Sequence, residues 1–158
     1  MRTERIEYSE VDEKQVHLVE ELRAQFVPFN QGLMPDFPEE YSDEAMERNL
    51  ARFLGKAERG AMRIFLARDR GTGRYVGFCM TTLDAHGEGC VDSFFVEADY
   101  RGSGIGRELF QRCLDWLDGQ RAVSVKLDVL PGNDGARRFY ERFGFRPLSV
   151  KMKRLKDR

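Results

Sequence analysis

The chain has 158 residues with 27 acidic and 26 basic side chains, so its formal net charge is −1. This length suits a single domain over residues 1–158, and an apolar fraction of 41% is ordinary for a soluble globular protein. The near balance of charge excludes a global attraction to nucleic acid or to an anionic membrane, so neither is an expected partner.

The cysteines and the start of the chain indicate the compartment. Cys79, Cys90 and Cys113 are odd in number and lack paired spacing, so we expect reduced core residues and no metal site. The first residues lack the apolar run of a signal peptide, and no later stretch is long enough to span a membrane. We therefore expect a cytoplasmic protein.

The first 60 residues predict one strand and two helices. Residues 6–9 indicate a strand, and Asp12 caps a segment whose apolar residues recur at helical spacing. A second helix begins after Ser42 and ends between Gly55 and Gly60. Residues 28–41, between the helices, combine prolines with acidic residues and predict a long loop of the kind that often carries function.

The middle of the chain changes to the alternation of strands. Residues 64–67 and 75–80 flank Arg70-Gly71-Thr72-Gly73, which predicts a β-hairpin. A second turn leads to a third antiparallel strand that ends in Phe94-Phe95-Val96. An amphipathic helix follows from about Ile105, and then a strictly alternating strand over 123–129. The strand–helix–strand order implies a parallel crossover.

The C-terminal part predicts a short helix and a last strand. Asn133 or Asp134 caps the helix, Gly144 ends it, and the strand runs from Phe145 or Leu148 to about Leu155. Its lysines fit a guarded sheet edge better than a nucleic-acid contact. The predicted order is β-α-α-β-β-β-α-β-α-β, which gives an α/β fold of the α+β kind, a mixed sheet covered by helices.

A glycine-rich loop separates the third antiparallel strand from the amphipathic helix. In Arg101-Gly102-Ser103-Gly104-Ile105-Gly106, the glycines allow close approach and the helix start offers free N–H groups, which suits a pyrophosphate. No lysine and hydroxyl follow as a P-loop requires. Asp128, 22 positions after Gly106 (128 − 106), fits a dinucleotide site, but the GxGxG spacing and late position oppose it. A tight turn without a ligand remains an alternative.

Three stretches of the second half share the pattern of one family. The loop from Arg101 to Gly106 fits its Arg/Gln-x-x-Gly-x-Gly/Ala signature. Phe94-Phe95-Val96 before Tyr100-Arg101-Gly102 fits its fourth strand and turn. Its fifth strand, short helix and Gly-Phe exit are matched by Val129, Asn133, Ala136, Phe139-Tyr140-Glu141 and Phe143-Gly144-Phe145. Over residues 90–146 the chain resembles the GNAT superfamily of N-acetyltransferases, whereas the first 60 residues match only in element type.

The resemblance implies acetyl-CoA as co-substrate and a GNAT-like fold in which the fourth and fifth strands splay apart. The loop amides would hold the CoA pyrophosphate with help from Arg107, and the pantetheine arm would lie along the fourth strand. A bulge there would free one N–H for the thioester carbonyl. The implied cofactor-binding residues are Phe94, Phe95, Val96, Arg101, Gly102, Ser103, Gly104, Ile105, Gly106, Arg107, Asn133, Phe139 and Tyr140.

Two residues are candidates for the acid and base that acyl transfer needs. Tyr140 matches the family's general acid, and a phenol with a usual pKa of about 10 stays protonated at neutral pH. Its alternative role is packing against the sheet. Asp92 is the candidate base, although a solvent-facing residue without chemistry fits equally well. Because no nucleophilic Ser or Cys arrangement is present, direct transfer in a ternary complex is favoured.

The acceptor is the least determined part of this expectation. The acidic residues of the long loop and its exit suit a small cationic amine, although a solvated surface explains them as well. They are Asp36, Glu39, Glu40 and Asp43. The alternative to an amine acetyltransferase is a CoA-binding sensor or scaffold without catalysis. The oligomeric state stays open, and a homodimer is one state that the sequence allows.

Overall fold

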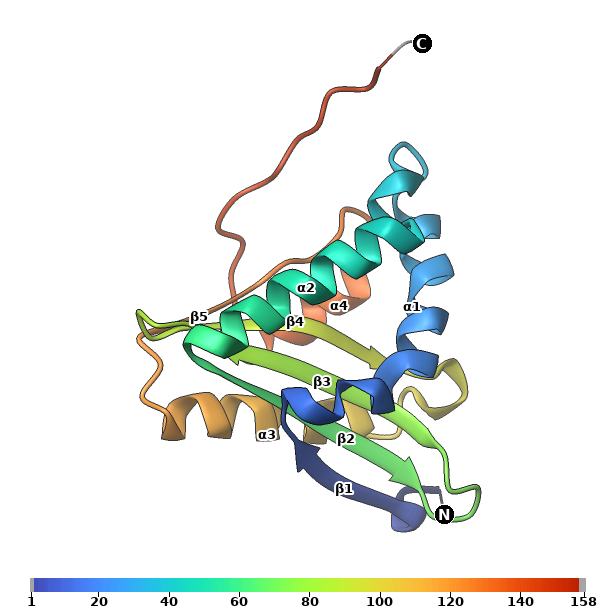
Figure 1. Cartoon of the computed structure of the whole chain (residues 1–158). Coiled ribbons are helices and arrows are strands. Elements are labelled where there is room, and N and C mark those ends of the chain that lie inside the picture. Colours follow the sequence, from blue (N-terminus) through green and yellow to red (C-terminus); the bar gives the residue numbers. More distant parts are fainter. Residues whose placement is uncertain (1, 157–158) are drawn as a thin grey trace.

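The computed structural model describes residues 2–156 and is built around one five-stranded sheet in the order β1-β2-β3-β4-β5 (Figure 1). The first four strands run antiparallel to their neighbours, and β5 runs parallel to β4. The strands are β1 (Ile6–Val11), β2 (Ala61–Asp69), β3 (Tyr75–Leu83), β4 (Glu88–Val96) and β5 (Ser124–Leu127). The predicted mixed sheet is therefore confirmed.

Helices cover both faces of this sheet. On one face, α1 (Glu20–Leu33) and α2 (Asp43–Arg59) pack Leu22 and Phe53 against Phe78 of β3. On the other, α3 (Ile105–Gly119) and α4 (Asp134–Glu141) belong to a second apolar cluster around Phe110 (Figure 1). Each helix has one apolar face, and burying it against the sheet is the main source of its stability.

The region before α2 is more helical than the sequence predicts. Asp12 caps a 3-10 helix over Glu13–Val19, and α1 then continues through Pro28 to Leu33, so the expected loop over 28–41 is wrong for most of its length. A second 3-10 helix covers Pro38–Tyr41. Pro28 removes one helical hydrogen bond, but tertiary contacts hold the helix, since Phe26 packs edge-on against Phe95 at 6.3 Å.

The predicted second helix and hairpin are confirmed. The Ser42 hydroxyl accepts a hydrogen bond from the Ala45 N–H at 3.1 Å and caps α2, which runs past Gly55 and ends at Arg59, with Gly60 as its C-cap. The tight turn between Asp69 and Tyr75 joins β2 to β3 in antiparallel register. Ser42 and the glycines at the turn act through local geometry, which is why the sequence identified these elements correctly.

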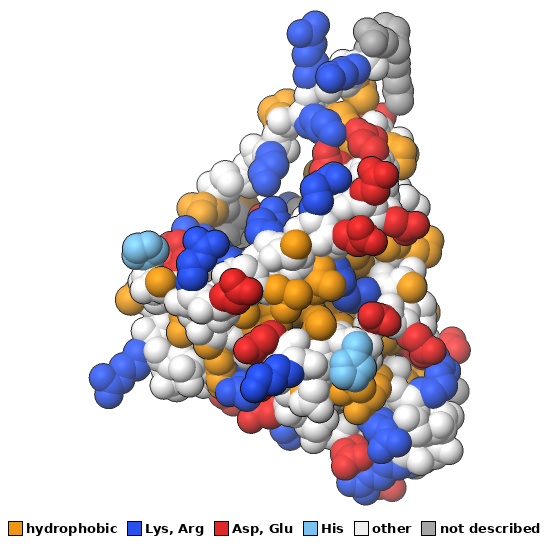
Figure 2. All heavy atoms as spheres, in the orientation of Figure 1, with side chains coloured by type: hydrophobic (Ala, Val, Ile, Leu, Met, Phe, Trp, Pro, Cys, Tyr) orange, Lys and Arg blue, Asp and Glu red, His pale blue; other side chains and the backbone are white. Residues whose placement is uncertain are grey.

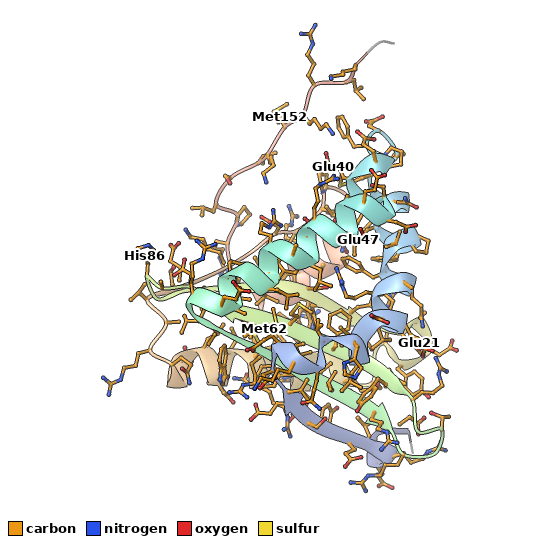
Figure 3. The ribbon with its side chains drawn as sticks, viewed as in Figure 1. Glu21, Glu40, Glu47, Met62, His86 and Met152 are labelled. Atoms are coloured by element: carbon orange, nitrogen blue, oxygen red, sulfur yellow. The ribbon has the colours of Figure 1, made fainter. Side chains whose placement is uncertain are left out.

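The predicted last strand is wrong. Residues 146–156 leave the body of the molecule without strand pairing (Figure 1). Leu148, Val150 and Met152 are at least 81% exposed, and Met152 points away from the other elements (Figure 3). An alternating pattern stabilises a strand only when a neighbouring strand pairs with it and one face is buried. Here β5 has four residues and receives no partner from this segment.

Cys79 and Cys113 are free and buried, as predicted, whereas Cys90 is free but only partly buried. Within residues 2–156, no helix combines the length and the apolar character needed to cross a bilayer.

Candidate active site

The two parallel strands pair over only part of their length. Glu88 through Val91 of β4 face Ser124 through Leu127 of β5, and the pairing stops there. Residues 92–96 of β4 have no partner on that side among the described residues, so the strands splay as expected. The β4–β5 cleft opens at this point and encloses about 900 Å³.

A β-bulge lies at the start of the splayed part. Thr81 pairs with Val91 and Met80 pairs with Ser93, so Asp92 is an extra residue on β4. Such a residue is left out of the ladder. The bulge stands two residues before Phe94, and not within Phe94–Val96, where the resemblance implied it. Ser93 lines the cleft, and its hydroxyl is buried without a hydrogen-bond partner in the described structure.

The glycine loop forms the opposite end of the cleft. Gly102 and Gly104 have φ angles of 75° and 88°, in the region that favours glycine. A Cβ at either position would meet no atom within 4 Å, so the space before the loop is open. The first helical bond of α3 runs from the Glu108 N–H to the Gly104 carbonyl at 3.0 Å. The preceding amides, including that of Gly106, can therefore bind an anion.

Other residues of the loop hold it in place. The Arg101 N–H donates to the Ala98 carbonyl at 3.2 Å, and its Nε donates to the Val96 carbonyl at 2.8 Å. The Ser103 hydroxyl donates to the Tyr100 carbonyl at 2.5 Å. Ile105 is 1% exposed and belongs to the core. Only the glycines, Arg101 and Arg107 of this loop line the cleft, so the predicted set combines lining residues with supporting ones.

An aromatic group forms the wall opposite α1 and α2. Phe94 lies 5.7 Å from Phe139 and 6.3 Å from Tyr140 between ring centroids, and all three line the cleft. Burial raises the pKa of Tyr140 above its ordinary value, so the phenol stays protonated at neutral pH. The Tyr140 ring thus packs against the core on one side and borders the cleft on the other.

Asn133 lies at the same wall and is the N-cap of α4. Its side-chain oxygen accepts a hydrogen bond from the Ala136 N–H at 3.3 Å and caps α4. Its NH₂ group remains as a donor beside the cleft.

Asp92 is paired, which the sequence did not reveal. Lys56 of α2 forms an ion pair with its carboxylate, and the Thr82 hydroxyl donates to the same group at 2.6 Å. The Asp92 side chain is 1% exposed. Lys56 lies 36 positions away and on another element, so no sequence spacing could have identified this pair.

The cleft also contains one thiol, on Cys90. Burial raises the pKa of Cys90 to about 12. The thiol therefore stays protonated, and thiolate attack to form a covalent acyl-enzyme is unfavourable.

The acidic residues expected to select the acceptor do not border the cleft. The Lys153 ammonium binds Glu39 at 3.0 Å and Glu40 at 2.5 Å, so these carboxylates face the C-terminal segment. Figure 2 shows acidic and basic side chains gathered side by side toward the top of the molecule. The wall is formed instead by one face of α2 together with residues of α1. We call it the α1–α2 wall, and its polar residues are Arg23, Asn30, Asn49, Arg52 and Lys56.

Comparison with known proteins agrees with this geometry. The family model described as "Acetyltransferase (GNAT) family" matches residues 26–145. N-alpha-acetyltransferase 30 of Schizosaccharomyces pombe is 32% identical over 76 residues, which cover 46% of this chain and 51% of that protein. Spermine/spermidine N(1)-acetyltransferase of Bacillus subtilis is 30% identical over 81 residues, covering 46% and 53%. The chain thus spans about half the length of these curated relatives.

Solved structures extend the likeness to the first 60 residues. A mutant of the BH1408 protein from Bacillus halodurans superposes with a TM-score of 0.72 at 19% identity, covering 93% of this chain and 97% of that one. At this identity the likeness concerns the fold alone.

Proposed function

Because the chain belongs to the acetyltransferase (GNAT) family, we propose that it transfers the acetyl group of acetyl-CoA directly to a primary amine in a ternary complex. The observation that carries this proposal is the splay of β4 from β5, with the open glycine loop at one end and Tyr140 on the wall. Such a cleft can hold a thioester and an amine side by side, so that the amine attacks the thioester directly.

The proposed site divides acetyl-CoA between the loop and the strand. The amides at the start of α3, with Arg107 beside them, would hold the pyrophosphate. The pantetheine arm would follow Phe94, Phe95 and Val96, the part of β4 without a partner on β5. The unsatisfied hydroxyl of Ser93 and the bulged backbone at Asp92 suit a carbonyl oxygen that becomes negative during attack.

Tyr140 and Asp92 are proposed as acid and base. Tyr140 holds the proton that the leaving thiolate takes up, and its raised pKa keeps that proton in place at neutral pH. Asp92 would accept the ammonium proton through water, since its carboxylate is already bound by Lys56 and Thr82. The amine then attacks the carbonyl carbon as a neutral nucleophile.

The acceptor is proposed to be a small amine that is cationic before it reacts. Asp128 lines the cleft after β5 and lies near Tyr41, whose pKa is raised chiefly by burial and also by that carboxylate. An ammonium group fits beside Asp128 and Asp92. Two curated relatives are named as spermine acetyltransferases, and this similarity supports an amine acceptor.

The variant Tyr140→Phe tests the proposal. We expect acetyl-CoA affinity to stay within about two-fold and thiol release in the presence of an amine to fall at least about 100-fold. Tyr8→Phe is the matched control, because Tyr8 lies on β1 away from the cleft. Acetyl-CoA binding without turnover of any amine by the wild type would favour the alternative, a sensor or scaffold that binds CoA.

A further inference from the structure

The α1–α2 wall carries an excess of positive charge. Arg23, Arg52 and Lys56 face the cleft, and no Asp or Glu of α1 or α2 is among the described residues that line it. Asp92 neutralises Lys56. The Glu20 carboxylate acts electrostatically on Arg23 but does not line the cleft, so the two guanidinium groups have no carboxylate partner on α1 or α2 within it.

Arg23 is a cation in a largely buried place. Its Nε is buried without a hydrogen-bond partner in the described structure, and its Nη2 reaches only the Met46 carbonyl at 3.4 Å. Asp43 and Glu47 border a separate cavity of about 310 Å³ with Arg23, yet no described ion pair joins them to it. A buried donor of this kind is costly unless a ligand satisfies it.

Arg52 continues the same surface along α2. Asn49, Arg52 and Lys56 are three to four residues apart and share one helical face. The Arg52 guanidinium lies 5.4 Å from the centre of the Phe53 ring and forms no ion pair in the described part of the chain. From Met46, where Arg23 attaches, to Arg52 the rise along the helix is about 9 Å. A small molecule can therefore contact both arginines.

This positive surface belongs to other elements than the expected pyrophosphate site. The glycine loop follows Val96 and has its own cations at the cleft, Arg101 and Arg107. Arg23 and Arg52 belong to α1 and α2. The CoA phosphates thus have basic partners at the loop itself, which leaves the arginines of the wall for the acceptor.

We propose, on the basis of the amine acetyltransfer argued above, that the acceptor carries an oxyanion, either a carboxylate or a phosphate ester, in addition to its amine. Arg23 and Arg52 bind the oxyanion, Asn49 lies between them, and the amine points toward Asp92 and Asp128. A polyamine has no such group and meets repulsion at this wall. The wall therefore selects among small amines by a second, negatively charged group.

Matched pairs of acceptors test this proposal. A panel of small primary amines includes 4-aminobutyrate against putrescine, for a carboxylate, and O-phosphoethanolamine against ethanolamine, for a phosphate ester. For at least one pair we expect kcat/KM to be about 10-fold higher for the oxyanion-bearing member. The ratio within that pair should fall at least about five-fold in Arg52→Gln and Arg23→Gln, mainly through KM, with the KM for acetyl-CoA unchanged.

Arg48→Gln is the matched control, since Arg48 is exposed on α2 outside the cleft and the ratio should not change. Thermal unfolding of each variant monitors folding. If the Arg23 variant fails to fold, Arg52→Gln still tests the proposal, because Arg52 is exposed. Equal or better turnover of putrescine and ethanolamine overturns the inference and leaves the proposed function standing. Absence of turnover with every amine overturns both.

Discussion

The pairing of Asp92 sets how this residue can act. A carboxylate held by Lys56 and by the Thr82 hydroxyl keeps one orientation and costs little further ordering when a substrate arrives. The same contacts occupy both oxygens, which favours proton transfer through a water molecule over direct abstraction. Lys56 thereby becomes a positioning residue that acts through Asp92.

We predict that Asp92→Asn lowers kcat at least about 10-fold with little change in the KM for acetyl-CoA, because the amide cannot accept the ammonium proton. Steady-state rates measured at one pH over a range of acetyl-CoA concentrations check this. Asp115→Asn is the control, since Asp115 is exposed on α3. A variant with a lower melting temperature and an unchanged kcat would assign Asp92 a structural role only.

Asp69 is a second carboxylate with a defined environment. The Tyr100 hydroxyl at 2.6 Å, the Gly71 N–H and Arg5 all donate to it, and the first of these contributes most to lowering its pKa from 3.8 to about 2. The unfolded chain binds the proton more tightly, so Asp69 stabilises the fold above about pH 4, and this contribution is lost as the pH falls through about 2.

We therefore predict that wild type loses more stability than Asp69→Asn between pH 4 and pH 2. Urea unfolding at several pH values in this range measures the difference, and subtracting the variant removes the effect of the other carboxyl groups. Parallel curves for the two proteins would show that the contacts of Asp69 do not depress its pKa in solution.

At the scale of elements, the turn from β4 into α3 prepares the anion site before any ligand binds. Positive φ angles at Gly102 and Gly104 aim the backbone outward, and Arg101 ties the loop to the Val96 carbonyl. A Cβ added at Gly106 would lie 3.4 Å from the Phe94 ring, so the absence of a side chain there lets α3 lie close to β4. Strand, loop and helix are thus joined by direct contacts.

We predict that Gly104→Ala destabilises the fold by roughly 1–2 kcal/mol, because its φ of 88° is strained for alanine, and weakens acetyl-CoA binding about 10-fold or more. Chemical denaturation and calorimetric titration measure the two effects. Gly119→Ala in the last turn of α3 is the control, since it has open space and should stabilise by up to about 1 kcal/mol. Unchanged affinity in Gly104→Ala would place the pyrophosphate elsewhere.

At the scale of the whole molecule, the cleft exists because the sheet is only partly closed. β4 pairs with β3 from Gly89 to Val96 except at the bulged Asp92, which holds it in place while its other edge is free beyond Val91. Helices on both faces bury the sheet and leave that edge open (Figure 1). The C-terminal segment does not cover it, although Lys151 reaches the border of the cleft.

We predict that removing residues 147–158 changes the free energy of unfolding by less than about 1 kcal/mol, because the described contacts of this segment include exposed ion pairs of Lys153. Urea denaturation of the shortened and full chains measures the change. A loss of several kcal/mol would mean that the segment pairs as a strand in solution.

The sequence by itself determined what depends on local geometry. Ser42 and Asn133 as caps and the glycines of the loop each act within a few residues, so the corresponding elements were predicted correctly. The GNAT pattern over residues 90–146 added the splay of β4 from β5, which the structure confirms.

Only the tertiary structure decided what joins distant parts of the chain. Helix α1 continues through Pro28 because its face packs on β4, and the last predicted strand is absent because no neighbour pairs with it. The ion pair of Lys56 with Asp92 and the positive α1–α2 wall likewise depend on α2 crossing the sheet. Burial and pairing depend on contacts between remote residues, and local sequence patterns do not record them.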